Sequence, residues 1–279
     1  MATSAPGSPQ PVTPPLAAQP GGAPGPAPAA DLFDAAGPQV LDRRQGPHGE
    51  VVLRRHGRLL QIIANGCFLM DTSDGRSERL LVSAALDTLL ATRGPGAAPR
   101  DGAREPQGGP HAGPSLLIGG LGVGFSLAEA AAEPRWGRID VVEREPAILD
   151  WHRDGPLAEI SSNALADPRV RLLEGDLLAL LRAAGPRYDA LCLDIDNGPD
   201  WQVTSDNEHL YSPTGLADCR SALADGGVLA VWSAHPSEEF ERNLRKAGFT
   251  GVHTREVPVA RGVPDVLFLA SHHLASQTA

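Results

Sequence analysis

The stretch SLLIGGLGVGFSLAEA, residues 115–130, decides the fold. An apolar run ends in Gly120, Gly122 and Gly124, spaced G-x-G-x-G, and an apolar helical pattern begins directly afterwards. A glycine turn between a strand and a helix lets a ligand approach the backbone and points amide N–H groups at it. We therefore expect this stretch to form the first strand, ligand loop and first helix of a nucleotide-binding type of unit.

The rest of the chain continues this alternation. Apolar strand patterns at 115–120, 138–145, 169–176, 188–197 and 227–234 alternate with helical patterns at 125–133, 146–153, 177–185, 212–227 and 237–249. Such alternation implies right-handed crossovers and a mainly parallel, doubly wound sheet. Two last strands, 251–260 and 264–273, follow without a helix between them, so we expect them to pair antiparallel at one edge. The prediction is an α/β, Rossmann-like domain with a seven-stranded sheet over 115–275.

A smaller unit precedes this domain. Residues 50–72 read as short strands interrupted at His56-Gly57 and at Asn65-Gly66, and Asn-Gly is a strong hairpin signal. Residues 75–91 then have helical spacing. We expect a small N-terminal β-meander with a helix over 38–91. Residues 1–37 and 92–114 are rich in proline, alanine and glycine, which predicts a disordered tail and a flexible linker.

Composition narrows the class of partner. The 279 residues carry a formal net charge of −10, which argues against nucleic acid and is compatible with a cationic small substrate. Three cysteines without short spacing give no zinc pattern and fit a reducing compartment. The chain shows neither a signal peptide nor an apolar run of membrane-spanning length, so we expect no membrane partner and a cytoplasmic location.

Acidic residues follow two neighbouring strands. Glu143 ends the strand after the glycine loop, where a carboxylate can accept hydrogen bonds from both ribose hydroxyls. Asp176 ends the next strand and could bind an adenine amine, or it could cap the following helix. The spacing G-x-G-x-G departs from the G-x-G-x-x-G of NAD proteins and resembles S-adenosylmethionine-dependent transferases, so NAD is the weaker alternative.

A third strand end carries the candidate catalytic group. In LCLDIDNGPDW, residues 191–201, Asp194 and Asp196 follow a buried strand, and we expect one of the two to point into the crevice. We favour Asp194. Trp201 and Tyr211 could form the wall of a site for a cation, or could pack loops onto the core. Trp232 is expected in the core.

The stretches LLIGGLGVGF, VVEREPAILDWHR, DPRVRLLEGD and YDALCLDIDNGPD together resemble the spermidine synthase-like proteins, relatives of the polyamine aminopropyltransferases, over about residues 48–272. The resemblance implies that the three loop glycines bind the donor's tail, that Glu143 holds the ribose and that Asp176 contacts adenine. It also implies that Asp194 helps activate an amine nucleophile. Glu78, in RSER, would correspond to a substrate-binding acid, although an exposed helix acid is the alternative. Members of the group are often dimers, so a homodimer is a further expectation.

One departure bears on the reaction. Spermidine synthases have a loop like G-G-G-D-G-G, whose aspartate holds the cationic tail of decarboxylated S-adenosylmethionine, whereas this chain has Gly122-Val123 there. Without that acid we expect intact S-adenosylmethionine as donor and methyl transfer to a small, amine-containing acceptor. Aminopropyl transfer from decarboxylated S-adenosylmethionine is the alternative. A non-catalytic relative that binds the nucleoside is a third possibility.

Overall fold

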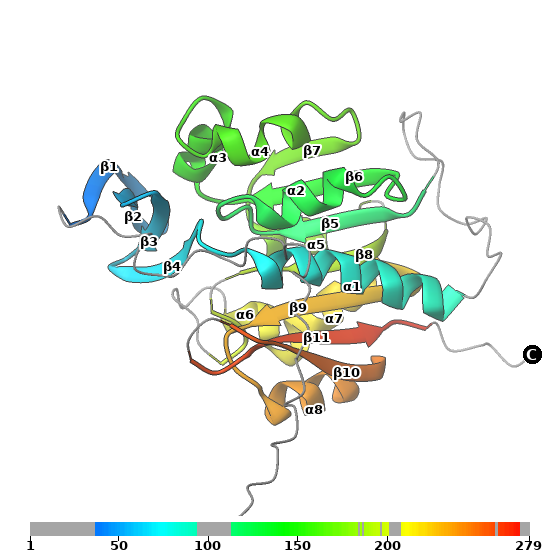
Figure 1. The fold of residues 1–279 in the computed structure, drawn as a ribbon. Coiled ribbons are helices and arrows are strands. Elements are labelled where there is room, and N and C mark those ends of the chain that lie inside the picture. Colours follow the sequence, from blue (N-terminus) through cyan, green and yellow to red (C-terminus); the bar gives the residue numbers. More distant parts are fainter. Residues whose placement is uncertain are drawn as a thin grey trace, which may run out of the picture.

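The computed structural model describes residues 37–93, 113–183, 185, 187–195, 197–200, 208–259 and 262–273 (Figure 1). Most of the predicted tail and linker therefore lies outside the described residues. The strands are β1 Gln39–Gly46, β2 Gly49–His56, β3 Leu59–Ala64, β4 Cys67–Asp71, β5 Ser115–Gly119, β6 Arg138–Glu143, β7 Val170–Glu174, β8 Tyr188–Leu193, β9 Leu223–Ser233, β10 Thr250–Val257 and β11 Asp265–Ser271. The helices are α1 Arg76–Arg93, α2 Phe125–Ala132, α3 Pro146–Arg153, α4 Ala158–Leu165, α5 Leu177–Arg182, α6 Glu208–Tyr211, α7 Pro213–Ala222 and α8 Glu238–Lys246.

The larger sheet has seven strands in the order β10-β11-β9-β8-β5-β6-β7. The neighbours from β9 to β7 are parallel, and β11 runs antiparallel to both β9 and β10. This confirms the Rossmann-like fold and the antiparallel edge pair. Because β11 is reversed, its first residue lies at the same edge as the carboxyl ends of the parallel strands. That edge is where open α/β sheets bind ligands.

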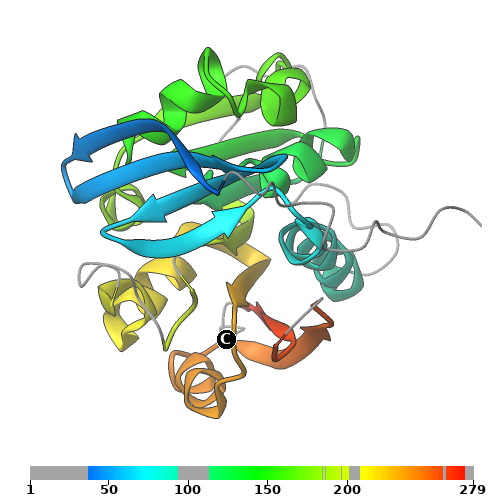
Figure 2. The same ribbon diagram turned by 60° about the vertical axis from the view of Figure 1, so that its left-hand side comes forward.

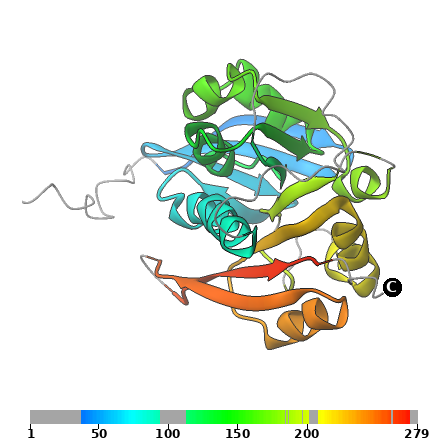
Figure 3. The same cartoon turned by 90° about the vertical axis from the view of Figure 1, so that its right-hand side faces the viewer.

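Helices cover both faces of this sheet (Figure 3). Helices α1 to α4 share one core with alternate strand residues such as Ala190 and Cys192 of β8. Helices α5 to α8 share the other core with Leu191 and Leu193 of the same strand. A parallel strand buried on both faces reads as a continuous apolar run, which explains why β5 and β8 could be recognised in the sequence.

The N-terminal unit is an antiparallel meander, β1-β2-β3-β4, lying beside the carboxyl edge of the larger sheet (Figures 1 and 2). Side-chain contacts between β1 and α3 help to attach it there. Trp151 Nε1 of α3 donates a hydrogen bond to Asp42 Oδ2 of β1 over 2.9 Å, and Arg44 pairs with Asp150 over 2.6 Å. Strand β1 was not predicted, because its polar, largely exposed residues lack an apolar alternation.

The ends of α7 and α1 differ from prediction. The helix predicted over 212–227 ends at Ala222, and the chain continues as β9 from Leu223. The reason is tertiary: Leu223 is fully buried and pairs with Tyr188, and the Gly226 N–H bonds to the His272 carbonyl. Helix α1 continues to Arg93, beyond its predicted end, and packs against β8, β9 and β11 of the larger sheet.

In the described part of the chain, no helix is both long and apolar enough to cross a bilayer.

Candidate active site

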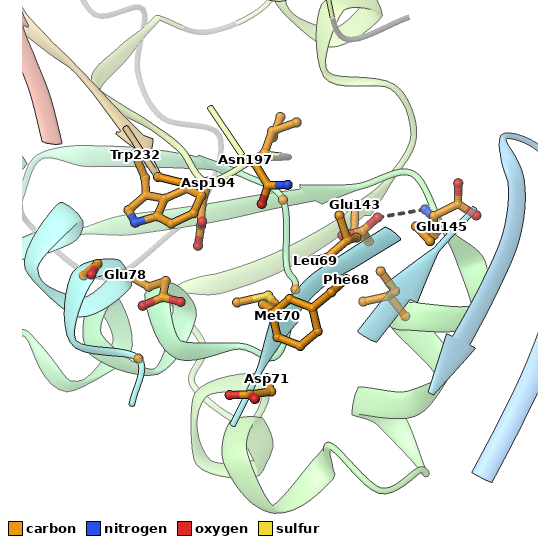
Figure 4. A pocket seen from close by; sticks show the side chains of 18 of the residues that line it. Phe68, Leu69, Met70, Asp71, Glu78, Glu143, Glu145, Asp194, Asn197 and Trp232 are labelled. Atoms are coloured by element: carbon orange, nitrogen blue, oxygen red, sulfur yellow. Dashed lines mark hydrogen bonds between the residues drawn. The ribbon is translucent and has the colours of Figure 1, made fainter. Parts of the chain in front are cut away.

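A cavity of about 850 Å³ lies at the carboxyl edge of the seven-stranded sheet, beneath the meander (Figure 4). Its walls come from the loops after β5, β6, β7, β8 and β9, from the start of β11, and from β4 with the first turn of α1. Among the predicted site residues that are described, it brings together Gly120, Gly122, Glu143, Asp176, Glu78 and Asp194. The volume is that of a small-molecule site.

The glycine loop needs its glycines for space as well as for backbone conformation. Gly120 and Gly122 have φ of 92° and 51°, in the left-handed region. A Cβ on Gly120 would lie 2.3 Å from the carbonyl oxygen of Asp194, and one on Gly122 would lie 2.3 Å from Met70 Sδ. Gly124 is buried against His152 and does not line the cavity. The loop therefore packs closely between the end of β8 and the meander.

Glu143 is held rigidly at the end of β6. Its Oε2 accepts a hydrogen bond from Leu121 N and its Oε1 accepts one from Glu145 N, both over 2.9 Å. Burial raises the pKa of this carboxyl, and backbone N–H groups of Glu145, Leu121 and Arg144 oppose that effect. A carboxylate has about four acceptor positions, so at least one stays available to a hydroxyl of a ligand.

Asp176 performs the structural role that the sequence left open. Its side chain accepts a hydrogen bond from Ala179 N over 2.7 Å and caps α5. The residue is exposed and also lines the cavity. Capping uses one oxygen, so the other is available to a donor group on a ligand.

Asp194 leaves β8 pointing into the cavity, where Glu78 of α1 points from the other side (Figure 4). Asp194 Oδ2 accepts a hydrogen bond from Ser126 Oγ over 2.9 Å. Burial, and then the charge of Asp194, raise the pKa of Glu78 to about 8. Burial also raises the pKa of Asp194 to about 6, with Ser126 opposing and Asp265 adding to the rise. The two carboxyl groups therefore repel each other when both are ionised.

A third acid, Asp265, belongs to this group, and we call Glu78, Asp194 and Asp265 the acidic cluster. Asp265 accepts hydrogen bonds from Ser77 Oγ over 2.5 Å and from Trp232 Nε1 over 3.3 Å. Asp265 was not among the site residues predicted from the sequence. The signal was present, because an antiparallel last strand brings its first residue to the carboxyl edge of the parallel strands.

Trp232 differs from expectation, and Tyr211 takes the second of its two predicted roles, packing a loop onto the core. Trp232, expected in the core, is only half-buried and lines the cavity. Tyr211 does not line it: the ring is buried edge-on against Phe240 at 5.7 Å, and its hydroxyl donates to the Ile195 carbonyl over 3.1 Å. Tyr211 thus supports the loop after β8 from behind. Asp196 and Trp201 lie outside the described residues.

The charge around the cavity is predominantly negative at the end that holds the acidic cluster. Among the described lining residues, the basic side chains with a permanent charge are Arg76 and Arg144. Arg76 lies 3.4 Å from Asp74, and Arg144 lies 3.9 Å from Glu145, so both are already beside carboxylates. This end of the cavity therefore favours a cation, and the Glu143 end offers acceptors for a diol.

Curated proteins resemble this chain in sequence, although no family model matches it. Polyamine aminopropyltransferase 2 of Streptomyces coelicolor is 36% identical over 156 residues, covering 53% of this chain and 27% of that protein. Polyamine aminopropyltransferase of Mycobacterium tuberculosis is 28% identical over 201 residues, covering 71% of this chain and 33% of that protein. The chain thus spans a third or less of the length of these two relatives.

Solved structures share the fold. Spermidine synthase in complex with the transition-state analogue AdoDATO has a TM-score of 0.65 at 15% identity, covering 84% of this chain and 73% of that one. Spermidine synthase from Thermotoga maritima has a TM-score of 0.62 at 15% identity, covering 84% and 72%. The resemblance to spermidine synthase-like proteins is confirmed. The relatives are transferases of aminopropyl groups, and the expectation of methyl transfer finds no support among them.

Proposed function

We propose that this chain, which resembles the spermidine synthase-like proteins, transfers an aminopropyl group from decarboxylated S-adenosylmethionine to an amine acceptor. The observation that carries the proposal is the acidic cluster beside the glycine loop. Glu143 and Asp176 would hold the nucleoside at the other end of the cavity. This replaces methyl transfer as the leading hypothesis.

The charge of the donor's tail decides between the two reactions. Intact S-adenosylmethionine ends in both a carboxylate and an ammonium, whereas the decarboxylated donor ends in an ammonium alone. A tail carboxylate next to Glu78 and Asp194 would add a like charge to a pair whose pKa values are already raised. An ammonium would relieve that repulsion. Glu78, reaching in from α1, can thus supply the charge that spermidine synthases place in the loop itself.

Asp194 is the candidate base for the transfer. An amine attacks only as the neutral form, so its ammonium must lose a proton before or during attack. A carboxyl whose pKa is raised to about 6 accepts a proton more readily than an ordinary aspartate. In the displacement a C–N bond forms to the aminopropyl carbon, the C–S bond breaks, and its electron pair stays on sulfur as the thioether nucleoside leaves. Ser126 would hold Asp194 in position.

Asp265 and Trp232 extend the site beyond the reacting centre. The Asp265 carboxylate is oriented by Ser77 and by the Trp232 indole N–H, and both Asp265 and Trp232 line the cavity. A second ammonium of a linear diamine or polyamine could pair with this carboxylate, because buried or half-buried cations need a charged partner. The acceptor we propose is therefore a small aliphatic amine with more than one cationic centre.

Turnover with defined donors tests the proposal. Purified protein is incubated with a linear diamine and either decarboxylated or intact S-adenosylmethionine, and the products are identified by mass. An acceptor heavier by an aminopropyl group, together with methylthioadenosine, supports the proposal. A methylated acceptor formed from the intact donor would overturn it. Donor binding without any transfer would instead favour the non-catalytic relative, and binding of NAD in place of either donor would favour an NAD-linked enzyme. A homodimer stays a prediction, and sedimentation of the same preparation tests it.

A further inference from the structure

We propose that Met70 sets the donor selectivity of this site, because its thioether occupies the position at the glycine loop that a donor's carboxylate would need. The inference rests on the proposed function and deepens it. It identifies a residue of the meander, outside the glycine loop and the acidic cluster, that discriminates between decarboxylated and intact S-adenosylmethionine.

Met70 lies in β4, paired with Ile62, and its side chain crosses to the glycine loop. Its Sδ is 3.3 Å from Val123 N, which donates a hydrogen bond to it. The same sulfur would be 2.3 Å from a Cβ on Gly122, so the thioether lies directly over that glycine. Met70 lines the cavity between the acidic cluster and Glu143 (Figure 4).

The orientation of this peptide group is fixed from behind. The Gly122 carbonyl lies 2.9 Å from His152 Nε2, and His152 Nδ1 lies 2.8 Å from Ser161 Oγ. In a trans peptide the C=O and the following N–H point in opposite directions. Holding the Gly122 carbonyl on the α3 and α4 side therefore turns the Val123 N–H toward Met70 and the cavity.

The Val123 N–H is a donor that an anion would use, since backbone N–H groups at the start of a helix after a glycine loop favour negative ligands. A thioether is a weak acceptor, and a carboxylate is a strong one. Met70 satisfies this donor and fills the space above Gly122. A tail carboxylate could reach the N–H only by displacing the methionine, whereas a tail without a carboxylate needs no such partner. The thioether then offers a polarisable apolar surface to the methylenes of the tail.

The test compares donor affinities in truncated variants. Met70→Ala and Met70→Val both shorten the side chain, and Val40→Ala is a matched control that truncates an exposed aliphatic residue of the same meander, away from the cavity. Calorimetric titration with intact and with decarboxylated S-adenosylmethionine gives a ratio of dissociation constants for each protein. Thermal melting of each variant, done first, sets a titration temperature at which all are folded.

We expect the wild type and Val40→Ala to prefer the decarboxylated donor. We expect Met70→Ala to shift the ratio by about tenfold or more toward the intact donor, the scale of one charge-assisted hydrogen bond, with Met70→Val intermediate. If the wild type prefers the decarboxylated donor and neither truncation changes the ratio, the role of Met70 is refuted while the proposed function stands. If the wild type binds the intact donor at least as tightly, or binds neither donor, the proposed function fails and this inference fails with it.

Discussion

Replacing Glu78 by glutamine should make the empty protein more stable, and increasingly so as the pH rises. In the folded chain, burial and the charge of Asp194 raise the pKa of Glu78 from its ordinary 4.5 to about 8. In the unfolded chain the carboxyl ionises near its ordinary pKa. Between these two values the folded state keeps a proton that the unfolded state releases. The free energy of unfolding therefore falls with rising pH over that window.

The size of the effect follows from the same two pKa values. Each pH unit between them contributes about 1.4 kcal/mol, so the span from 4.5 to about 8 sets an upper limit of about 5 kcal/mol. Glu78 is only half-buried, and water in the cavity screens its charge, so a smaller effect is expected. We expect Glu78→Gln to raise the free energy of unfolding by about 1–3 kcal/mol at pH 8.5 and to leave it nearly unchanged at pH 4.5.

Urea denaturation at both pH values, followed by fluorescence, measures the difference between wild type and variant. Asp87→Asn is the matched control, because Asp87 is an exposed carboxylate on the same helix, away from the cavity. An equal difference between Glu78→Gln and wild type at both pH values would refute the reasoning. So would a gain at pH 4.5 that disappears at pH 8.5, since that has the opposite sign.

Three further outcomes are expected. Asp194→Asn should lower kcat/KM for aminopropyl transfer by about 10²- to 10⁴-fold, because the proton acceptor is lost. The melting temperature should not fall, because the repulsion between Asp194 and Glu78 is relieved. Retained activity in a turnover assay would exclude Asp194 as the base. Gly120→Ala should destabilise the fold by about 2 kcal/mol or more and weaken donor binding, because its φ is 92° and its Cβ would meet the Asp194 carbonyl; unchanged melting and titration curves would contradict this. Trp151→Phe should cost about 1 kcal/mol at neutral pH for the indole donor that Asp42 loses, in addition to the packing lost with this buried ring. The indole N–H is the largest factor lowering the pKa of Asp42, so the stability lost with this hydrogen bond should be smaller in acid. Urea denaturation of wild type and variant at pH 7 and at pH 3 measures the difference.

Much of the fold could be predicted from the sequence because the signals are local. A strand buried on both faces reads as an apolar run, as in β5 and β8, and a glycine loop followed by helical spacing defines the first crossover. The carboxyl ends of parallel strands lie at one edge of a sheet, so the sequence also predicted that Glu143, Asp176 and Asp194 share that edge. Strand β1 and the end of α7 could not be predicted in this way, since pairing partners far along the chain decide them.

The acidic cluster also combines features that follow from the sequence with features that only the tertiary structure decides. The sequence by itself determined a doubly wound sheet with carboxylates at its carboxyl edge, because strand direction and hydrophobic period are properties of short segments. Only the tertiary structure decided that Asp265 from a reversed strand and Glu78 from an N-terminal helix meet Asp194, and that Met70 of the meander covers Gly122. Those contacts join residues far apart in the chain, and packing between separate elements, which no local pattern records, brings them together.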